Sequence, residues 1–442
     1  MIKVRFAPSP TGEMHIGNLR TAIINWIFAR KFQGKLYLRI EDTDGERSKD
    51  EYVEKLLKVL KTMKIDYDEF DNNKGTEKGI MYQSKRLEIY RKKAQEIYNQ
   101  GMAFYCECEK DSEEICLCKN KNLEKGVLRF RVPDRVLSFE DRIFGKLEIE
   151  SKTLENFALL RSDGSPTYML AVVVDDIEME ITHIIRGEDH KTNTFKQILI
   201  YEALNSKIPE FAHLPIIIGE DNKKLSKRNG NVNVQYYLNQ GFVPDSLFNF
   251  LLRLGWGYKN EEIISKERIK EIFDFRDVKR SPAKFDEKKC LSFSKTYLKN
   301  KEYCEELKQY IEEFKNLTLT PRENRFIEEI YEEVSKRSST FSEFYEHIDF
   351  IFKNKKFLED KNFIMLDFLK NPADPADKQY YGILEELFST STNFFYRLKE
   401  LCPKYEVDFK EISGYLRQKI TGKEFSPDIF IIIELLEKIR YF

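Results

Sequence analysis

The sequence predicts an α/β protein with a parallel-sheet domain, an insertion within that domain and all-helical domains after it. Strand-like and helix-like patterns alternate over residues 1–90, which favours parallel strands joined by crossover helices. Residues 91–186 hold a cysteine cluster and short β-like runs, which indicates an insertion. After residue 300, glycine is sparse and apolar residues recur at intervals of three and four. That spacing is typical of a helical bundle.

The first half of the parallel sheet is predicted from four segments. MIKVRFA forms a first strand, and apolar residues at helical spacing predict a helix over Leu19 to Phe32. KLYLRIEDTD alternates as a second strand and ends in acidic residues. EYVEKLLKVLKTM, from Glu51 to Met63, is an amphipathic helix. This order places the loop after MIKVRFA at the carboxyl edge of the sheet, where parallel sheets bind ligands.

The insertion and the second half of the sheet follow. GVLRFRVP, KLEIE and FALLRSDGSPTYMLAVVVDD have β-like patterns. The α/β alternation resumes with the strand ITHIIRGEDH, the helix NTFKQILIYEAL and the apolar strand HLPIII. Near the end of the chain, DIFIIIELLEKI is predicted to be a helix of the bundle.

Composition narrows the class of protein. A chain of 442 residues is too long for one core, so several domains are expected. The net charge of −1, from 74 basic and 75 acidic residues, identifies no partner, but 34% charged residues can still form a basic face for nucleic acid. No run approaches the roughly 20 apolar residues of a membrane span. MIKVRF lacks the apolar core of a signal peptide, so a cytoplasmic protein without a membrane partner is expected.

Two loops have the chemistry of a polyphosphate site. PSPTGEMHIG is the first strand-to-helix loop, and the helix after it offers unpaired N–H groups to a phosphate. His15 adds an imidazole donor there, and Gly17 lets a flat base approach the backbone. NKKLSKRNG places Lys224 and Lys227 where they could offset charge on a transferring group. Taken singly, the loops also fit a proline-rich turn with a surface histidine and a solvated basic loop.

As a pair, HIGN and KLSKR resemble the two ATP signatures of class I aminoacyl-tRNA synthetases. The surrounding sequence narrows the resemblance to bacterial-type glutamyl-tRNA synthetase, and it covers essentially the full chain in the family's order. The matching segments include RFAPSPTGEMHIGNLRTA, LRIEDTDGERS, SPTYMLAVVVDDIEMEITHIIRGEDH, LLRLGWG, RSPAKFD and LRQKITGKEFSPDIFIIIELL. One departure is Asn18, where the general signature has a second histidine. Asparagine still donates a hydrogen bond.

The resemblance implies a Rossmann-type catalytic domain and a reaction in two steps. Glutamate attacks the α-phosphate of ATP and releases pyrophosphate, and the terminal ribose of tRNA(Glu) then takes the glutamyl group. Mg²⁺ is expected with ATP, held by phosphates and water. A monomer is expected, and whether tRNA(Gln) is also charged stays open. The implied domains are catalytic 1–90, acceptor-end-binding 91–186, catalytic 187–239, stem-contact 240–310 and anticodon-binding 311–442.

The resemblance also implies residue roles. His15, Lys224 and Lys227 would be catalytic. The ATP-binding residues would be His15, Gly17, Asn18, Asp189, His190 and Lys227. The glutamate-binding residues would be Arg5, Ala7, Ser9, Glu41, Tyr168 and Arg186. From the residues alone, Glu41 also fits an acid at a helix N-terminus, and Arg186 a structural ion pair.

The cysteine cluster FYCECEKDSEEICLCK predicts a structural Zn²⁺ site. Cys106, Cys108, Cys116 and Cys118 form two Cys-x-Cys pairs, and four thiolates can complete a tetrahedral site. The family often has zinc after YC-x-C, although its second pair usually lies further along. The alternative is four reduced thiols in an insertion. The other cysteines, Cys290, Cys304 and Cys402, are scattered and read as structural.

Three alternative kinds of protein share parts of the sequence pattern. A glutaminyl-tRNA synthetase is the nearest, but it lacks an arginine in the place of Arg186. A tRNA-modifying glutamyl transferase lacks the helical anticodon domain, whereas helix-like sequence continues here to the end of the chain. An inactive RNA-binding paralogue is disfavoured by the intact His15, Gly17, Lys224 and Lys227.

Overall fold

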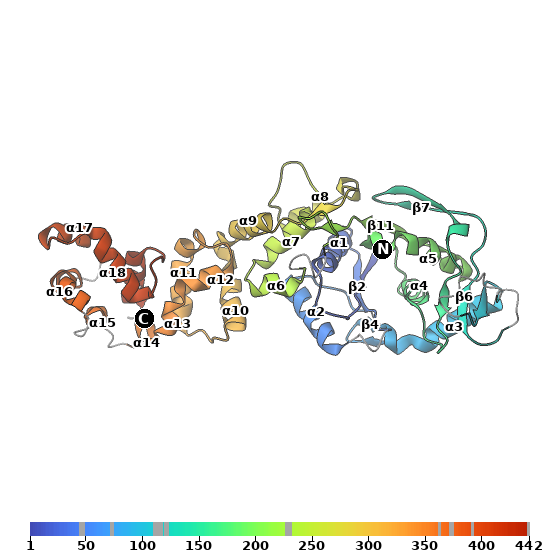
Figure 1. The fold of residues 1–442 in the computed structure, drawn as a ribbon, viewed down its shortest axis with the longest axis horizontal. Coiled ribbons are helices and arrows are strands. Elements are labelled where there is room, and N and C mark those ends of the chain that lie inside the picture. Colours follow the sequence, from blue (N-terminus) through green and yellow to red (C-terminus); the bar gives the residue numbers. More distant parts are fainter. Residues whose placement is uncertain are drawn as a thin grey trace. The chain divides into compact units, whose positions relative to one another are not determined.

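The computed structural model describes two compact units. It covers residues 1–43, 49–70, 75–108, 118, 123–225, 232–360, 364–370, 375–389 and 393–439, without the side chains of 375–377. The first unit comprises residues 1–236 and 248–286, and the second comprises 237–247 and 287–442. Figure 1 shows strands in the blue-to-green segments and helices alone in the orange and red segments. The predicted fold class is confirmed, whereas the predicted five-part domain division stays a prediction.

The first unit is built on parallel strands. Strand β1 (Lys3–Phe6) pairs in parallel with β2 (Lys35–Ile40), which pairs in parallel with β4 (Ile80–Tyr82). In a second parallel pair, β10 (His183–Gly187) lies against β11 (Glu210–Leu214). The two pairs meet at β1 and β10, because the backbone N–H of Thr182 donates to the carbonyl of Lys3 at 2.9 Å. The carboxyl ends of β1 and β10 therefore lie where the order of strands along the chain changes, the usual ligand position in such sheets.

The helices that follow these strands match the predicted ones. Helix α1 (Ile16–Lys31) follows β1, α2 (Asp50–Thr62) follows β2, and α5 (Lys191–Ala203) follows β10. Helix α1 buries eleven residues, including Trp26, and its sequence is apolar on most faces because the helix lies within the unit.

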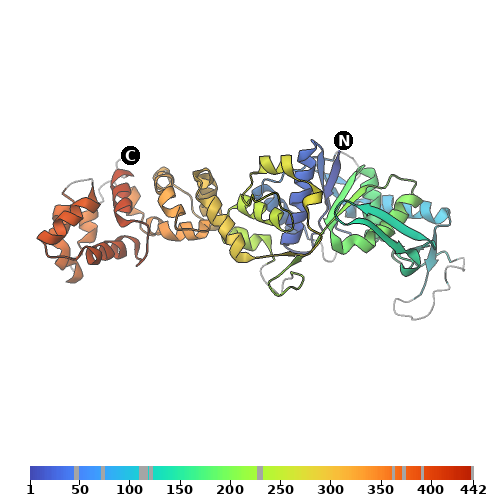
Figure 2. The same ribbon diagram turned by 90° about the horizontal axis from the view of Figure 1, so that it is seen from above.

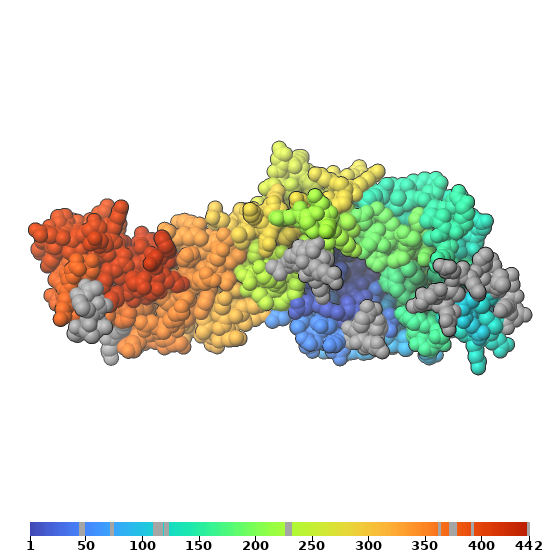
Figure 3. Space-filling model, in the orientation of Figure 1, coloured from blue at the N-terminus to red at the C-terminus, as the bar shows by residue number. Residues whose placement is uncertain are grey.

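On one face of the molecule, the blue segment that starts the chain and the green segment after β10 meet in space (Figure 3).

The insertion forms antiparallel strands of its own. Strand β5 (Ala103–Cys106) pairs with β6 (Val127–Phe130), which pairs with β9 (Ala158–Leu160). Strands β7 (Val136–Asp141) and β8 (Gly145–Glu150) form a hairpin, and β7 also pairs with β11. The predicted strands GVLRFRVP and KLEIE are thus present, and the hairpin connects the insertion to the parallel sheet.

One predicted β-like segment is largely a helix. FALLRSDGSPTYMLAVVVDD contains β9 but then forms α4 (Tyr168–Glu178). Its β-branched run is buried all round, and short apolar runs do not distinguish strand from buried helix. At the end of that run, Asp175 and Asp176 are buried too, and both form ion pairs with arginines. The strand prediction for this stretch was wrong because burial outweighed β-propensity.

The predicted strand HLPIII is divided into two. Strand β11 ends at Leu214, and β12 (Ile217–Ile218) pairs in parallel with β13 (Ala283–Lys284). Pro215 between them has no N–H to donate to a sheet ladder. The other elements up to residue 284 are β3 (Thr76–Glu77), α3 (Leu87–Asn99), α6 (Val234–Asn239), α7 (Pro244–Arg253) and α8 (Lys266–Ile272).

The second unit contains only helices among its described elements, as predicted for the end of the chain (Figure 2). They are α9 (Glu287–Leu298), α10 (Cys304–Phe314), α11 (Pro321–Ser335), α12 (Phe341–Ile348), α13 (Phe350–Lys353), α14 (Lys356–Glu359), α15 (Met365–Leu369), α16 (Pro375–Leu387), α17 (Phe394–Lys404), α18 (Phe409–Thr421) and α19 (Ile429–Ile439). Their apolar faces share one core, to which α19 contributes the buried Ile429, Ile433 and Leu436. Within the described residues of the chain, no helix has the length and apolar character needed to cross a membrane.

Candidate active site

A cavity of about 600 Å³ lies at the carboxyl ends of β1 and β10. Its walls come from the loop after β1, the start of α1, the segment after β10 and the turn after β11. Each of the described residues predicted for ATP or glutamate lines it, namely Arg5, Ala7, Ser9, His15, Gly17, Asn18, Glu41, Tyr168, Arg186, Asp189, His190 and Lys224. The structure thus brings together residues that lie up to about 220 positions apart in the sequence. Lys227, the other predicted site residue for ATP, lies outside the described residues.

His15 caps the helix that points at the cavity. It is the N-cap of α1, and its Nδ1 accepts a hydrogen bond from the backbone N–H of Gly17 at 2.9 Å. Because Nδ1 accepts, the proton of a neutral ring is on Nε2, which becomes a donor. A Cβ on residue 17 would lie 3.2 Å from His15 Nδ1, so glycine also allows this cap. The backbone N–H groups of residues 16–19 already donate within the protein, contrary to the unpaired groups expected from the sequence. A donor to an anion at this end of α1 would therefore be a side chain such as the imidazole of His15, beside the positive end of the helix dipole.

The far side of this cavity carries a charged pair and a neutral histidine. Lys224 Nζ lies 3.1 Å from Asp189 Oδ2, and both side chains are more than half exposed. The Tyr168 hydroxyl lies 3.1 Å from Nδ1 of His190. Burial, followed by the charge of Arg186, lowers the pKa of His190 to about 4. His190 is therefore neutral at physiological pH and adds a hydrogen-bonding group rather than a charge.

Arg186 is a buried cation whose partners are all neutral. Its guanidinium donates to Thr194 Oγ1 and Gln197 Oε1, both at 2.7 Å, to the Tyr168 hydroxyl at 3.3 Å and to His213 Nε2 at 3.4 Å. Within the described part of the chain, no carboxylate forms an ion pair with it. Burial lowers the pKa of Arg186, but an arginine remains charged at neutral pH. The alternative of a structural ion pair therefore finds no support, and the site suits an anionic ligand.

Arg5 in β1 and Glu41 directly after β2 lie on the same wall of the cavity. Arg5 Nε donates to Asp176 Oδ1 at 3.1 Å, and Arg39 donates to the same oxygen at 2.7 Å. Arg39 also donates to Glu41 Oε1 at 3.3 Å. Burial raises the pKa of Glu41, against the opposing charges of Arg39 and Arg5. Glu41 follows β2 and precedes no described helix directly, so the alternative of a helix N-terminal acid does not hold.

The sequence reasoning missed the residues that hold these arginines. Asp176 and Arg39 hold Arg5 and Glu41, whereas Thr194, Gln197 and His213 hold Arg186. One signal was available, because residues 194 and 197 lie on one face of the predicted helix NTFKQILIYEAL. A histidine at the start of the predicted strand HLPIII was a second signal, but neither pattern indicates which side chain is contacted.

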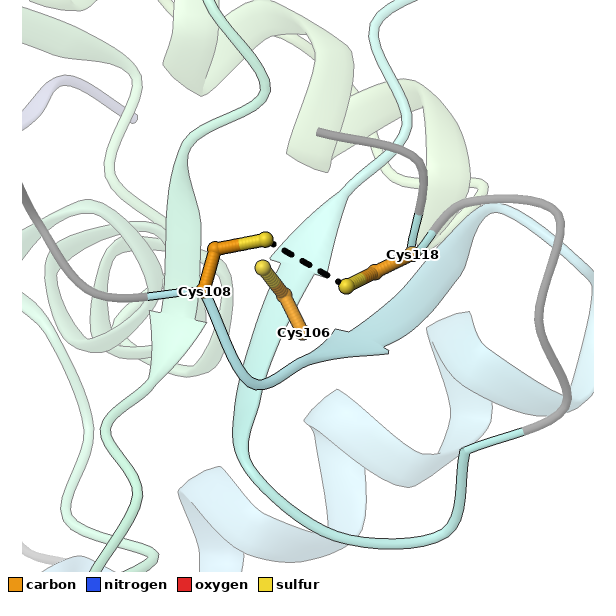
Figure 4. Close-up of side chains that lie close together, drawn as sticks. All are labelled: Cys106, Cys108 and Cys118. Carbon is orange, nitrogen blue, oxygen red and sulfur yellow. Dashed lines mark hydrogen bonds between the residues drawn. The ribbon is translucent and has the colours of Figure 1, made fainter. Parts of the chain in front are cut away.

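Three of the four predicted zinc ligands lie together (Figure 4). The sulfur atoms of Cys106, Cys108 and Cys118 lie within 4.8 Å of one another, and those of Cys108 and Cys118 are 3.4 Å apart. Zn–S bonds of about 2.3 Å in a tetrahedron place sulfur atoms about 3.8 Å apart. Cys106 and Cys118 are buried. The three thiols therefore fit Zn²⁺, and Cys116 lies outside the described residues.

Comparison with known proteins decides the family. The model of the class I tRNA synthetase (E and Q) catalytic domain matches residues 1–122 and 112–292, and an anticodon-binding domain model matches 302–441. The glutamate–tRNA ligase of Nitrosomonas europaea is 35% identical, covering 99% of this chain and 96% of its own. The chain belongs to the glutamate–tRNA ligase family of class I aminoacyl-tRNA synthetases.

Other members of the glutamate–tRNA ligase family agree with this assignment. The enzyme of a Sulfurihydrogenibium species is 46% identical over 68% of each chain. A crystal structure of a glutamate tRNA ligase from Elizabethkingia meningosepticum, in complex with its amino acid, superposes with a TM-score of 0.76. It is 26% identical and covers 99% of this chain and 97% of its own. The resemblance inferred from the sequence is therefore confirmed, and so is the enzyme class.

Proposed function

We propose that the chain activates L-glutamate with ATP as glutamyl-adenylate and transfers the glutamyl group to the 3′ end of tRNA(Glu). The proposal rests on one observation, the composition of the cavity. It combines His15 at the N-terminus of α1, where the helix dipole favours a phosphate, with the buried Arg186, whose partners among the described residues are neutral. Family membership supports the same reaction.

ATP would lie against the start of α1. His15 and Asn18 would donate to phosphate oxygens, and Gly17 would allow the adenine to approach the backbone. Lys224 and Lys227 would stabilise the charge that develops as pyrophosphate leaves. Mg²⁺ would bind with ATP through phosphate oxygens and water. The remaining work of this site is positioning, because no covalent enzyme intermediate is needed.

Glutamate would occupy the part of the cavity between Arg5 and Arg186. The two arginines suit the two carboxylates of the substrate, since a guanidinium binds a carboxylate in a two-point geometry. Glu41 suits the substrate ammonium, and its buried carboxylate is already near the charges of Arg39 and Arg5. Ala7, Ser9 and Tyr168 would complete the walls.

An exchange assay tests this proposal directly. Radioactive pyrophosphate should enter ATP only when glutamate and tRNA are both present, because family resemblance suggests that activation requires tRNA. Glutamine in place of glutamate should support little exchange. Exchange with glutamine at an equal rate would contradict the assignment. Charging of purified tRNA(Glu) and tRNA(Gln) decides separately which tRNA is used.

A structural Zn²⁺ is proposed for the insertion. Cys106, Cys108 and Cys118 would hold it, with Cys116 as the fourth ligand. When bound, the metal would supply cross-linking rather than catalysis, because four thiolates leave no open position. It would fix Cys106 and Cys108, at the end of β5, to Cys118. We further propose that the protein acts as a monomer in the cytoplasm, which sedimentation and cell fractionation can test.

A further inference from the structure

Asp141 and His213 form a buried pair, and His213 in turn contacts Arg186. Both side chains have no exposed surface, and His213 Nδ1 lies 2.6 Å from Asp141 Oδ2. The same oxygen accepts the backbone N–H of His213 at 3.0 Å. The other carboxylate oxygen accepts the backbone N–H groups of Ile143 and Phe144 at 2.9 and 2.8 Å. Four donors hold the Asp141 carboxylate in one orientation.

This pair fixes the tautomer of His213. The Asp141 carboxylate accepts from Nδ1, so the proton of the neutral ring is on Nδ1 and Nε2 carries a lone pair. Nε2 lies 3.0 Å from Thr194 Oγ1 and accepts from Arg186 Nε at 3.4 Å. Burial lowers the pKa of His213, and Arg186 opposes protonation while Asp141 favours it. His213 therefore presents an acceptor, not a second cation, to the arginine.

Neutral acceptors suit an arginine that must bind a ligand carboxylate. An acidic side chain in place of His213 would pair with Arg186 and compete with the ligand. An apolar side chain would leave Nε–H without an acceptor in a buried site, which is costly. A histidine with a fixed tautomer avoids both outcomes. Its orientation depends on β7 of the insertion, which pairs with β11 beside it.

We propose that His213, oriented by Asp141, is a positioning residue that holds Arg186 for the side-chain carboxylate of glutamate. This inference rests on the proposed role of Arg186 in glutamate binding. It connects the insertion to substrate recognition, because Asp141 ends β7 whereas Arg186 lies in β10. Neither residue of the pair lines the cavity, so both act through Arg186.

The test compares His213→Leu with His213→Gln in the full chain. The glutamine oxygen can accept from Arg186, whereas leucine cannot. In exchange assays with tRNA, we expect His213→Leu to raise the KM for glutamate about tenfold or more, with the KM for ATP within about twofold of normal. His213→Gln should recover most of the loss. An unchanged KM for glutamate in His213→Leu would overturn the proposal, as would equal impairment of both variants with a parallel rise in the KM for ATP.

A second variant keeps the test decisive if leucine prevents folding. Asp141→Asn preserves the size of the side chain but can donate to His213 Nδ1, which moves the ring proton to Nε2. Nitrogen NMR of the five histidines should show the change of tautomer, together with a raised KM for glutamate. A changed tautomer with a normal KM would refute the positioning role. Failure of the proposed function is distinguishable, because the unmodified protein would then show no glutamate-dependent exchange.

Discussion

Asp176 holds Arg5 in a buried ion pair, in which Arg5 Nε lies 3.1 Å from Asp176 Oδ1 across 171 positions of the sequence. Arg39 donates to the same oxygen at 2.7 Å. Burial alone would raise the pKa of Asp176, but the charges of Arg39 and Arg5 outweigh it and the pKa is lowered. One carboxylate of α4 therefore holds an arginine of β1 that lines the cavity and one of β2 that does not.

Asp176→Asn should lower both stability and glutamate binding. The substitution leaves the buried guanidinium groups of Arg5 and Arg39 without the carboxylate that both of them contact. Breaking a buried ion pair costs about 3–5 kcal/mol of stability. Urea unfolding measures the loss, and exchange kinetics should show a raised KM for glutamate. Glu180→Gln is the matched control, because it removes an exposed ion pair with Lys3 and should leave the free energy of unfolding nearly unchanged. Equal effects of the two substitutions would contradict this account.

Arg186→Leu should remove the preference for glutamate over glutamine. A buried arginine that faces a neutral amide loses a charge-assisted pair of about 1.5–3 kcal/mol, which is a preference of roughly ten- to a hundredfold. The measurement is kcat/KM for both amino acids in both proteins. Arg142→Leu, which removes an exposed arginine paired with Glu210, should leave the ratio unchanged. If the ratio survives in Arg186→Leu, Arg5 becomes the candidate for specificity.

Purified protein should carry about one zinc per chain, since the three described thiols fit a tetrahedral site. Cys106→Ser should reduce the zinc content, whereas Cys402→Ser, at a buried cysteine of the second unit, should not. A chelator should impair tRNA charging more than ATP binding. Metal analysis that finds no zinc in protein prepared without chelator would exclude the site.

Lys227→Ala should reduce amino-acid activation by roughly two to three orders of magnitude, because it removes a charge aimed at the transition state. Glutamate and tRNA binding should change little. Lys223→Ala removes an exposed lysine of the same segment and should retain near-normal activation. Near-normal exchange in Lys227→Ala would remove that lysine from the mechanism.

His190 should make the protein less stable as the pH falls from about 6.5 to about 4. The pKa of His190 is about 4 in the folded chain and about 6.5 in the unfolded chain. Between these two pH values the unfolded state binds more protons, so the free energy of unfolding decreases as the pH is lowered. Below about 4 both states are protonated and the loss ends. His190→Asn should remove this contribution, at most about 1.4 kcal/mol per pH unit. Urea unfolding of both proteins at several pH values measures it, and parallel curves would contradict it.

Local sequence patterns determined much of this protein. Helical spacing predicted α1, α2, α5 and α19, and strand patterns predicted β1, β2 and β10. The loop after the first strand was predicted to lie at the carboxyl edge of the sheet, where parallel sheets bind ligands. Family-specific motifs then predicted which side chains would line the cavity, and the described ones do.

Only the tertiary structure decided how the charged side chains are held. The run AVVVDD became a helix because packing on all sides outweighed its β-propensity. Asp176 meets Arg5, and Asp141 meets His213, across 171 and 72 positions. Periodicity reports which face of an element is buried, but it carries no information on partners so far away in the chain. Whether a buried arginine faces a carboxylate or neutral acceptors, and so whether it can bind a substrate anion, depends on those partners.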